Sequence, residues 1–158
     1  MSEVWKPSVT VAAVVHQDDR FLLVEEETSD GLRFNNPAGH LDPGESLIQA
    51  VIRETKEETA YDFKPTAWLG NYMSRYVSAR TGDDVTYLRV VFVGSVSNHD
   101  PSQKLDTGIV RAVWMTIEEI RAVRHLHRSP LVMRCIEDCL GGRRLPLDAV
   151  YTHDSVLE

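Results

Sequence analysis

The stretch from residue 39 to residue 61, GHLDPGESLIQAVIRETKEETAY, constrains the fold more than any other part of the chain. Its first residues include two glycines and a proline, which is typical of a loop. A helix is then predicted from about Ser46 to Thr59, because apolar or small residues recur at spacings of three and four. The residues that carry this pattern are Leu47, Ile48, Val51, Ile52 and Thr55.

Three carboxylates gather on one side of this predicted helix. At roughly 100° of rotation per residue, Glu54, Glu57 and Glu58 lie together beside the apolar stripe. Like charges at these spacings destabilise an isolated helix by about 0.2–0.5 kcal/mol per pair, so the cluster needs a counter-charge. Mg²⁺ is a natural partner, because it takes oxygen ligands and keeps waters and substrate phosphates among them. The alternative is that the three acids form a solvated helix face.

The spacing of polar residues across the stretch resembles the Nudix box. Six positions match that pattern in residue type and interval: Gly39, Glu45, Arg53, Glu54, Glu57 and Glu58. The resemblance implies an α/β (α+β) fold, built as an α/β/α sandwich with a mixed β-sheet. It also implies a hydrolase of nucleoside diphosphates linked to another moiety, which uses Mg²⁺ or Mn²⁺.

Three positions depart from the box. Thr55 replaces a bulky aliphatic residue, Ala60 replaces a glycine, and Tyr61 replaces an aliphatic residue. The glycine normally ends the helix in a left-handed conformation, in which a residue with a Cβ atom costs about 1–2 kcal/mol. These changes concern the end of the helix and one packing contact, and they leave the acids intact.

The resemblance assigns roles to the matching residues. Glu54, Glu57 and Glu58 are expected to bind the metal, with the carbonyl oxygen of Gly39 as a further ligand. One of these glutamates, or an acid elsewhere in the chain, is the expected general base. Metal ions supply most of the chemistry of pyrophosphate cleavage, and the carboxylates hold them and accept a proton.

Other candidates support or extend this set. Glu45 is expected to pair with Arg53 and fix the face that carries the ligands, although an ordinary salt bridge accounts equally well for that pair. Families of this kind often recruit an acid from a distant loop, and Asp106 is the first candidate, with Asp100 behind it. The sequence favours the simpler view that both are turn residues.

Two residues are candidates for substrate binding. His40 follows the box glycine and could contact a phosphate, whereas an exposed loop histidine is the simpler interpretation. Arg89 lies in a predicted strand and would bind phosphate if its side chain pointed into the cleft. An arginine on the solvated face of a strand would have the same sequence.

The rest of the chain predicts one sheet with helices on both faces. Strands are expected at residues 8–16, 20–26, 34–37, 66–77, 85–96 and 109–115, with a loop at 28–32 and a hairpin loop at 78–84. Further helices are expected at 117–124 and between Ser129-Pro130 and Gly141-Gly142. The box helix is expected on one face of the sheet and the C-terminal helices on the other.

Size and composition favour a single globular domain. The 158 residues, 42% hydrophobic and 26% charged, suit one domain at residues 1–150 with a loose tail at 151–158. There is no apolar run of the roughly 20 residues that cross a bilayer and no signal-like N-terminus, so a cytoplasmic location without a membrane partner is expected. The net charge of −7 argues against binding of a nucleic-acid polymer. It also disfavours an anionic pyrophosphate substrate, but a bound cation would reverse the local field around such a small molecule. Both a monomer and a homodimer are compatible with the sequence.

Beyond the box, the chain is similar nearly end to end to a narrower branch of bacterial Nudix phosphatases. The stretches that carry this likeness are WKPSVTVAAVVH, LLVEE, NPAGHL, YLRVVF, RSPLV and RRLPL. The likeness implies cleavage of thiamine pyrophosphate, hydroxymethylpyrimidine pyrophosphate and nucleoside di- and triphosphates. Two alternatives stay open. One is another Nudix specificity, for a nucleotide sugar, a dinucleoside polyphosphate or an oxidised nucleotide. The other is a catalytically silent ligand sensor.

Overall fold

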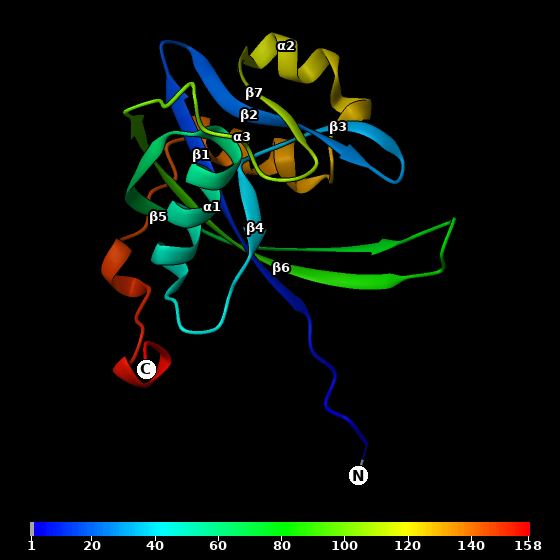
Figure 1. Ribbon diagram of the computed structural model, residues 1–158, viewed down its shortest axis with the longest axis vertical. Coiled ribbons are helices and arrows are strands. Elements are labelled where there is room, and N and C mark those ends of the chain that lie inside the picture. Colours follow the sequence, from blue (N-terminus) through cyan, green and yellow to red (C-terminus); the bar gives the residue numbers. More distant parts are fainter. Residues whose placement is uncertain (1) are drawn as a thin grey trace.

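The computed structural model describes residues 2–158 as helices packed on the two faces of a mixed sheet (Figure 1). The strands are β1 Ser8–Gln17, β2 Arg20–Thr28, β3 Gly31–Asn35, β4 Ala38–His40, β5 Asp62–Val77, β6 Asp84–Ser97 and β7 Ile109–Thr116. Their order is β3-β2-β1-β6-β5, and β4 pairs with β1 while β7 pairs with β2. β1 and β6 are parallel and the other pairs are antiparallel.

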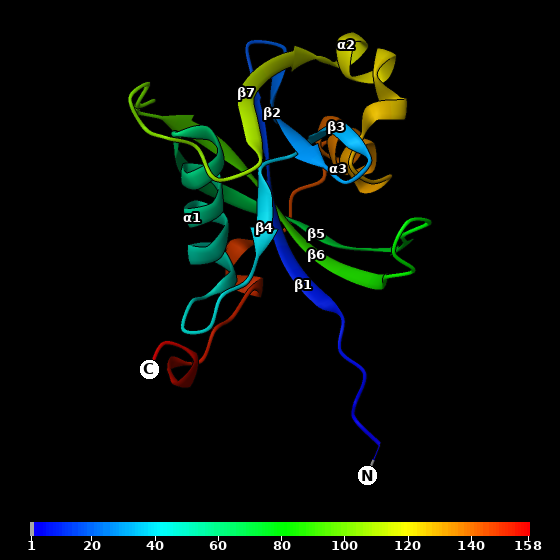
Figure 2. The ribbon, with the colours of Figure 1, turned by 45° about the vertical axis from the view of Figure 1, so that its right-hand side comes forward.

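Alternation along β1 explains why both faces of the sheet are covered. Val11, Ala13 and Val15 belong to the core cluster that includes α1, Leu47–Thr59, whereas Ala12 and Val14 pack with α3, Leu131–Leu140. Successive strand residues point to opposite faces, so an unbroken apolar run fits a strand buried on both sides. The two helices lie on opposite sides of the sheet, as expected (Figure 2).

The box helix α1 begins and ends as the sequence predicts. Ser46 caps it: its hydroxyl accepts a hydrogen bond from the N–H of Gln49 at 3.1 Å, and the Gln49 side chain accepts one from the N–H of Ser46 at 2.8 Å. Ala60 ends the helix at φ 61° and ψ 16°, the left-handed conformation. The expectation that Ile52 lies on the buried stripe was wrong, because Ile52 is 38% exposed. The buried face of α1 instead includes Val51 together with Glu54 and Glu58.

The connections around β3 differ from expectation. The expected loop at 28–32 is a two-residue turn. The Thr28 hydroxyl donates a hydrogen bond to the carbonyl oxygen of Gly31 and accepts one from the N–H of Asp30, and Gly31 adopts φ +95°. The expected strand at 34–37 is divided between β3 and β4, with a break at Asn36 and at Pro37, which lacks an N–H for the ladder.

Other differences concern the ends of elements. β5 begins at Asp62, before Pro65, and an irregular register between residues 65 and 67 accommodates the proline on this edge strand. The helix expected at 117–124 ends at Ala122 as α2, Ile117–Ala122, and is followed by the short 3₁₀ helix η1, Arg124–Leu126. Two more 3₁₀ turns, η2 Leu147–Ala149 and η3 Asp154–Val156, lie near the C-terminus. None of the described helices is long and apolar enough to cross a membrane.

Candidate active site

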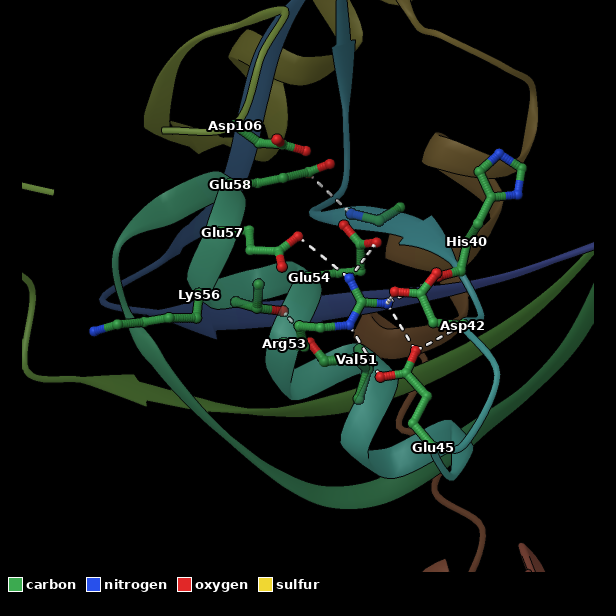
Figure 3. A network of polar contacts seen from close by, with 12 residues as sticks. His40, Asp42, Glu45, Val51, Arg53, Glu54, Lys56, Glu57, Glu58 and Asp106 are labelled. Atoms are coloured by element: carbon green, nitrogen blue, oxygen red, sulfur yellow. Dashed lines mark hydrogen bonds and ion pairs between the residues drawn. The ribbon is translucent and has the colours of Figure 1, made fainter. Parts of the chain in front are cut away.

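The short strand β4 and helix α1 bring the box residues together (Figure 3). Gly39 of β4 pairs with Val11 of β1, which places its backbone against the side of α1. A Cβ atom on Gly39 would overlap the carboxylate of Glu54. A side chain at this position would displace the Glu54 carboxylate, so the glycine leaves room for that carboxylate beside β4.

Arg53 connects the acids of the loop with those of the helix. Its guanidinium binds both carboxylate oxygens of Glu45, at 2.9 and 2.7 Å, and donates to Glu54 at 2.9 Å and to Glu57 at 3.2 Å. It also donates to the carbonyl oxygen of His40 at 3.0 Å. These hydrogen bonds keep the pKa of the Glu45 carboxyl below its usual range. The pairing of Glu45 with Arg53 is thus part of a network that includes two expected metal ligands.

Three carboxylates converge at the C-terminal half of α1. Oxygen atoms of Glu54, Glu57 and Asp106 all lie within 4.8 Å of one another. The loop that carries Asp106 is held in place because the Asp106 N–H donates to the carbonyl oxygen of Glu57 at 2.9 Å. This set of hard oxygen donors is the kind that Mg²⁺ and Mn²⁺ prefer, so the residues present fit a divalent cation.

The two loop acids have different surroundings. Asp106 belongs to the acid cluster, so the interpretation that it is only a turn residue does not account for its position. Asp100 accepts hydrogen bonds from the N–H and hydroxyl of Ser102, and its own N–H donates to the carbonyl oxygen of Ala60. Asp100 is thus a turn residue, and it does not line the pocket described below.

Glu58 stands apart from the three converging acids. Its carboxylate accepts a hydrogen bond from the N–H of Ala38 at 3.1 Å, and it lies near Asp106 in Figure 3. Burial, together with the nearby carboxylates of Glu26 and Glu54, raises the pKa of Glu58 to about 9. Burial also raises the pKa of Glu54. Glu58 needs a neighbouring positive charge to ionise at neutral pH, which a bound cation would supply.

A cavity of about 390 Å³ opens beside this cluster. Gly39, Glu54, Glu58 and Asp106 line one part of it. The remaining wall comes from the β2–β3 hairpin, from β5 and β6, from residues of β1 and β4, and from the start of α3 with the segment that precedes it. This volume is within the range of small-ligand sites, and the walls combine acids, arginines and tyrosines.

Both candidates for substrate binding line this cavity. Arg89 is only 7% exposed, and its guanidinium donates to the side-chain oxygens of Asn35 at 2.8 Å and Asn36 at 3.2 Å. Its interpretation as a residue on a solvated strand face was therefore wrong. His40 is exposed, as the simpler interpretation predicted, and its ring centroid lies 6.5 Å from that of Tyr87.

Part of the cavity wall consists of residues that the sequence did not indicate. Glu26 accepts a hydrogen bond from Asn35 at 3.4 Å and forms an ion pair with Arg128 at 3.3 Å. Asp30 and Tyr76 also line the cavity. The stretches LLVEE and RSPLV contain Glu26 and Arg128, but only the folded chain brings them together, so no local pattern marked them.

Comparisons with known proteins relate this chain to one family. The NUDIX domain family model matches residues 6–135. Phosphatase NudJ of Escherichia coli (strain K12) is 36% identical over 146 residues, which cover 92% of this chain and 92% of NudJ. A NUDIX hydrolase from Nitrosomonas europaea is 53% identical, with a TM-score of 0.86 over 94% of this chain and 99% of that chain.

A more distant structure agrees in fold alone. The MutT protein from Methanosarcina mazei Go1 is 22% identical, with a TM-score of 0.66 over 90% of this chain and 100% of that chain. The expected α/β/α sandwich with a mixed sheet is thereby confirmed. From its sequence, its fold and its box residues, the chain belongs to the Nudix hydrolase family.

Proposed function

We propose that this Nudix hydrolase is a metal-dependent pyrophosphohydrolase that acts on thiamine pyrophosphate, hydroxymethylpyrimidine pyrophosphate and nucleoside di- and triphosphates. The observation that carries the proposal is the convergence of Glu54, Glu57 and Asp106 oxygens within 4.8 Å at a cavity of about 390 Å³. Similarity to a phosphatase, NudJ, over 92% of both chains supports the choice of branch.

In this proposal the acids hold Mg²⁺ or Mn²⁺. Glu54, Glu57 and Asp106 would bind the ion, with Glu58 and the Gly39 carbonyl oxygen as further ligands. A bound ion of this kind lowers the pKa of a coordinated water and neutralises charge on the phosphoryl oxygens. A carboxylate of the cluster would accept the proton of the attacking water.

The arginine network would orient the ligands before any substrate binds. Arg53 donates to one oxygen of Glu54 and to one oxygen of Glu57, which fixes both side chains and leaves the second oxygen of each without an arginine partner. Glu45 in turn fixes Arg53 through two hydrogen bonds. Residues that orient metal ligands in this way commonly contribute about 10–100-fold in metal affinity or activity.

The phosphate groups of a substrate would lie between the acids and the positive side of the cavity. Arg89 supplies a buried guanidinium there, and His40 is an exposed group at the same wall. Because metal and phosphate contacts would supply most of the binding energy, the enzyme should tolerate different organic groups. A site built around one base would instead reject analogues by about 10⁴–10⁵.

A substrate screen with Mg²⁺ tests this proposal. Thiamine pyrophosphate should yield thiamine monophosphate and inorganic phosphate, and ATP and GTP should be cleaved with a kcat/KM within about two orders of magnitude of that value. Nucleotide sugars and dinucleoside polyphosphates serve as comparison substrates. No cleavage of thiamine pyrophosphate, together with strong preference for a comparison substrate, would contradict the proposed specificity.

A further inference from the structure

The tips of two hairpins meet at the cavity wall. Asp30 lies in the turn between β2 and β3, and Tyr76 lies near the end of β5, in the β5–β6 hairpin. Both hairpins project from the sheet on the side away from α1 (Figures 1 and 2). The phenol of Tyr76 donates a hydrogen bond to Oδ2 of Asp30 at 2.8 Å. This pair therefore joins the two hairpins beside the cavity, which both residues line.

Asp30 keeps unused capacity to accept a hydrogen bond. Within residues 2–158, its Oδ1 atom accepts no hydrogen bond and its carboxylate forms no ion pair. Glu26, another acid of the wall, is instead paired with Arg128 at 3.3 Å. Arg75 lines the cavity as well, but its charge is matched by Asp84 at 2.7 Å. Asp30 is thus an anchored carboxylate with one free oxygen at the wall.

The position of this oxygen suits the organic end of a substrate. If the phosphates lie at the acid cluster on α1, the ring they are attached to extends toward the projecting hairpins. A cavity of about 390 Å³ is larger than a pyrophosphate group needs and is within the range that accommodates a heterocycle. A carboxylate accepts hydrogen bonds and donates none when ionised, so it favours an amino group and disfavours a carbonyl group at the same ring position.

We propose that Asp30, held by Tyr76, is a specificity-determining residue that accepts a hydrogen bond from the exocyclic amino group of a substrate's pyrimidine ring. This inference rests on the proposed function and assigns a substrate class to it: pyrophosphates and triphosphates of amino-substituted rings. Cytosine carries an amino group where uracil carries a carbonyl oxygen. CTP and UTP therefore differ at the feature that Asp30 would recognise and share the same phosphates and sugar.

The test is the ratio of kcat/KM for CTP to that for UTP. For the wild type we expect a ratio of about ten, the size of effect for one hydrogen bond to a charged, partly exposed group. Asp30→Asn should bring the ratio close to one, because an amide can both accept from cytosine and donate to uracil. Tyr76→Phe keeps the ring and removes the hydrogen bond to Asp30, so it should give an intermediate ratio. Thr81→Ala, at the tip of the same hairpin and away from the cavity wall, should keep the wild-type ratio.

Opposite results would overturn the inference. A wild-type ratio of one or less, or an unchanged ratio in Asp30→Asn, would show that Asp30 does not read the ring. A general structural defect would lower both kcat/KM values equally and leave the ratio unchanged. If the wild type cleaves neither nucleotide, the nucleoside triphosphate part of the proposed function fails, and the inference is then tested by the affinities for CMP and UMP measured by calorimetry. Equal affinities in the wild type would overturn it independently of catalysis.

Discussion

Arg53 shows how much of the candidate site depends on the shape of one side chain. Its guanidinium contacts acids before and within α1 at the same time: Asp42, Glu45, Glu54 and Glu57. A planar fork with five N–H donors can make such contacts together, whereas a lysine ammonium acts as a single point charge. The acids around this arginine are therefore placed to match the directions of its N–H donors as well as to balance its charge.

The first prediction concerns the acids of α1. Glu57→Gln and Glu58→Gln should each lower the rate of thiamine pyrophosphate hydrolysis at least about a hundredfold, because the loss of one ligand or transition-state contact costs on the order of 2.7–4 kcal/mol. The melting temperature should show that both variants remain folded. Glu118→Gln, an exposed carboxylate of α2, is the matched control and should keep the wild-type rate. A near wild-type rate in either α1 variant would remove that residue from the ligand set.

The second prediction concerns Glu45, which contacts Arg53 and is not an expected ligand. Glu45→Gln should raise the Mg²⁺ concentration needed for half-maximal rate by about 10–100-fold, because Arg53 loses its bidentate partner. Glu25→Gln removes an ion pair of similar length, 2.9 Å to Arg111, and should leave the Mg²⁺ requirement unchanged. If Glu45→Gln changes only the stability and not the Mg²⁺ requirement, the pair is an ordinary salt bridge.

At the scale of elements, α1 is well specified by local sequence. Its first and last residues depend on signals within a few positions of one another, which is why the bounds near Ser46 and Thr59 were predictable. Ala60 is the exception to an ideal ending, since it adopts φ 61° with a Cβ atom. The buried methyl group offsets part of that cost, because each buried carbon contributes about 0.8 kcal/mol.

The third prediction follows from this ending. Ala60→Gly should leave the free energy of unfolding unchanged or raise it by up to about 1 kcal/mol, since relief of left-handed strain opposes the loss of the methyl group. Urea denaturation measures the change. Ala50→Gly is the matched control on the same helix: Ala50 is buried and helical, so its replacement should destabilise the protein by about 1 kcal/mol or more. A clear loss of stability in Ala60→Gly would refute the account of the helix end.

The elements also differ in how far the sequence could predict them. Periodicity predicted most strands within a few residues, because the apolar patterns of β1, β2 and β6 are continuous and strong. The choice between Asp100 and Asp106 could not be made, since it depends on how one polar loop packs across the end of α1. Likewise, the ion pair of Glu26 with Arg128 joins residues that are distant in sequence, and only the tertiary fold shows it.

At the scale of the whole molecule, the sheet is covered on both faces, and the candidate site lies at one end of α1. Apolar side chains of β1 pack against α1 on one face and against α3 on the other, so the core is closed on both sides (Figure 2). The polar residues gather where β4 meets the C-terminal half of α1 and the loop that carries Asp106. Glu54, Glu57 and Glu58 thus lie on a helix, Asp106 lies on a loop bonded to that helix, and the projecting hairpins supply part of the cavity wall.

The chain carries a net charge of −7, and several of its acids gather at the cavity. The acids at the cavity would repel the phosphates of the proposed substrate, and burial keeps the pKa of Glu58 at about 9. A divalent cation reverses the local field and allows both the carboxylates and the phosphates to remain charged. The proposed activity therefore depends above all on a bound divalent cation.

The most direct test is hydrolysis of thiamine pyrophosphate by protein stripped of metal with EDTA, before and after Mg²⁺ is added. We expect no phosphate release in the chelated buffer and full recovery with Mg²⁺, and the melting temperature should show that the stripped protein stays folded. Mn²⁺ should also restore activity, because it accepts the same oxygen ligands. Full turnover in thoroughly chelated buffer would contradict the metal site at Glu54, Glu57 and Asp106.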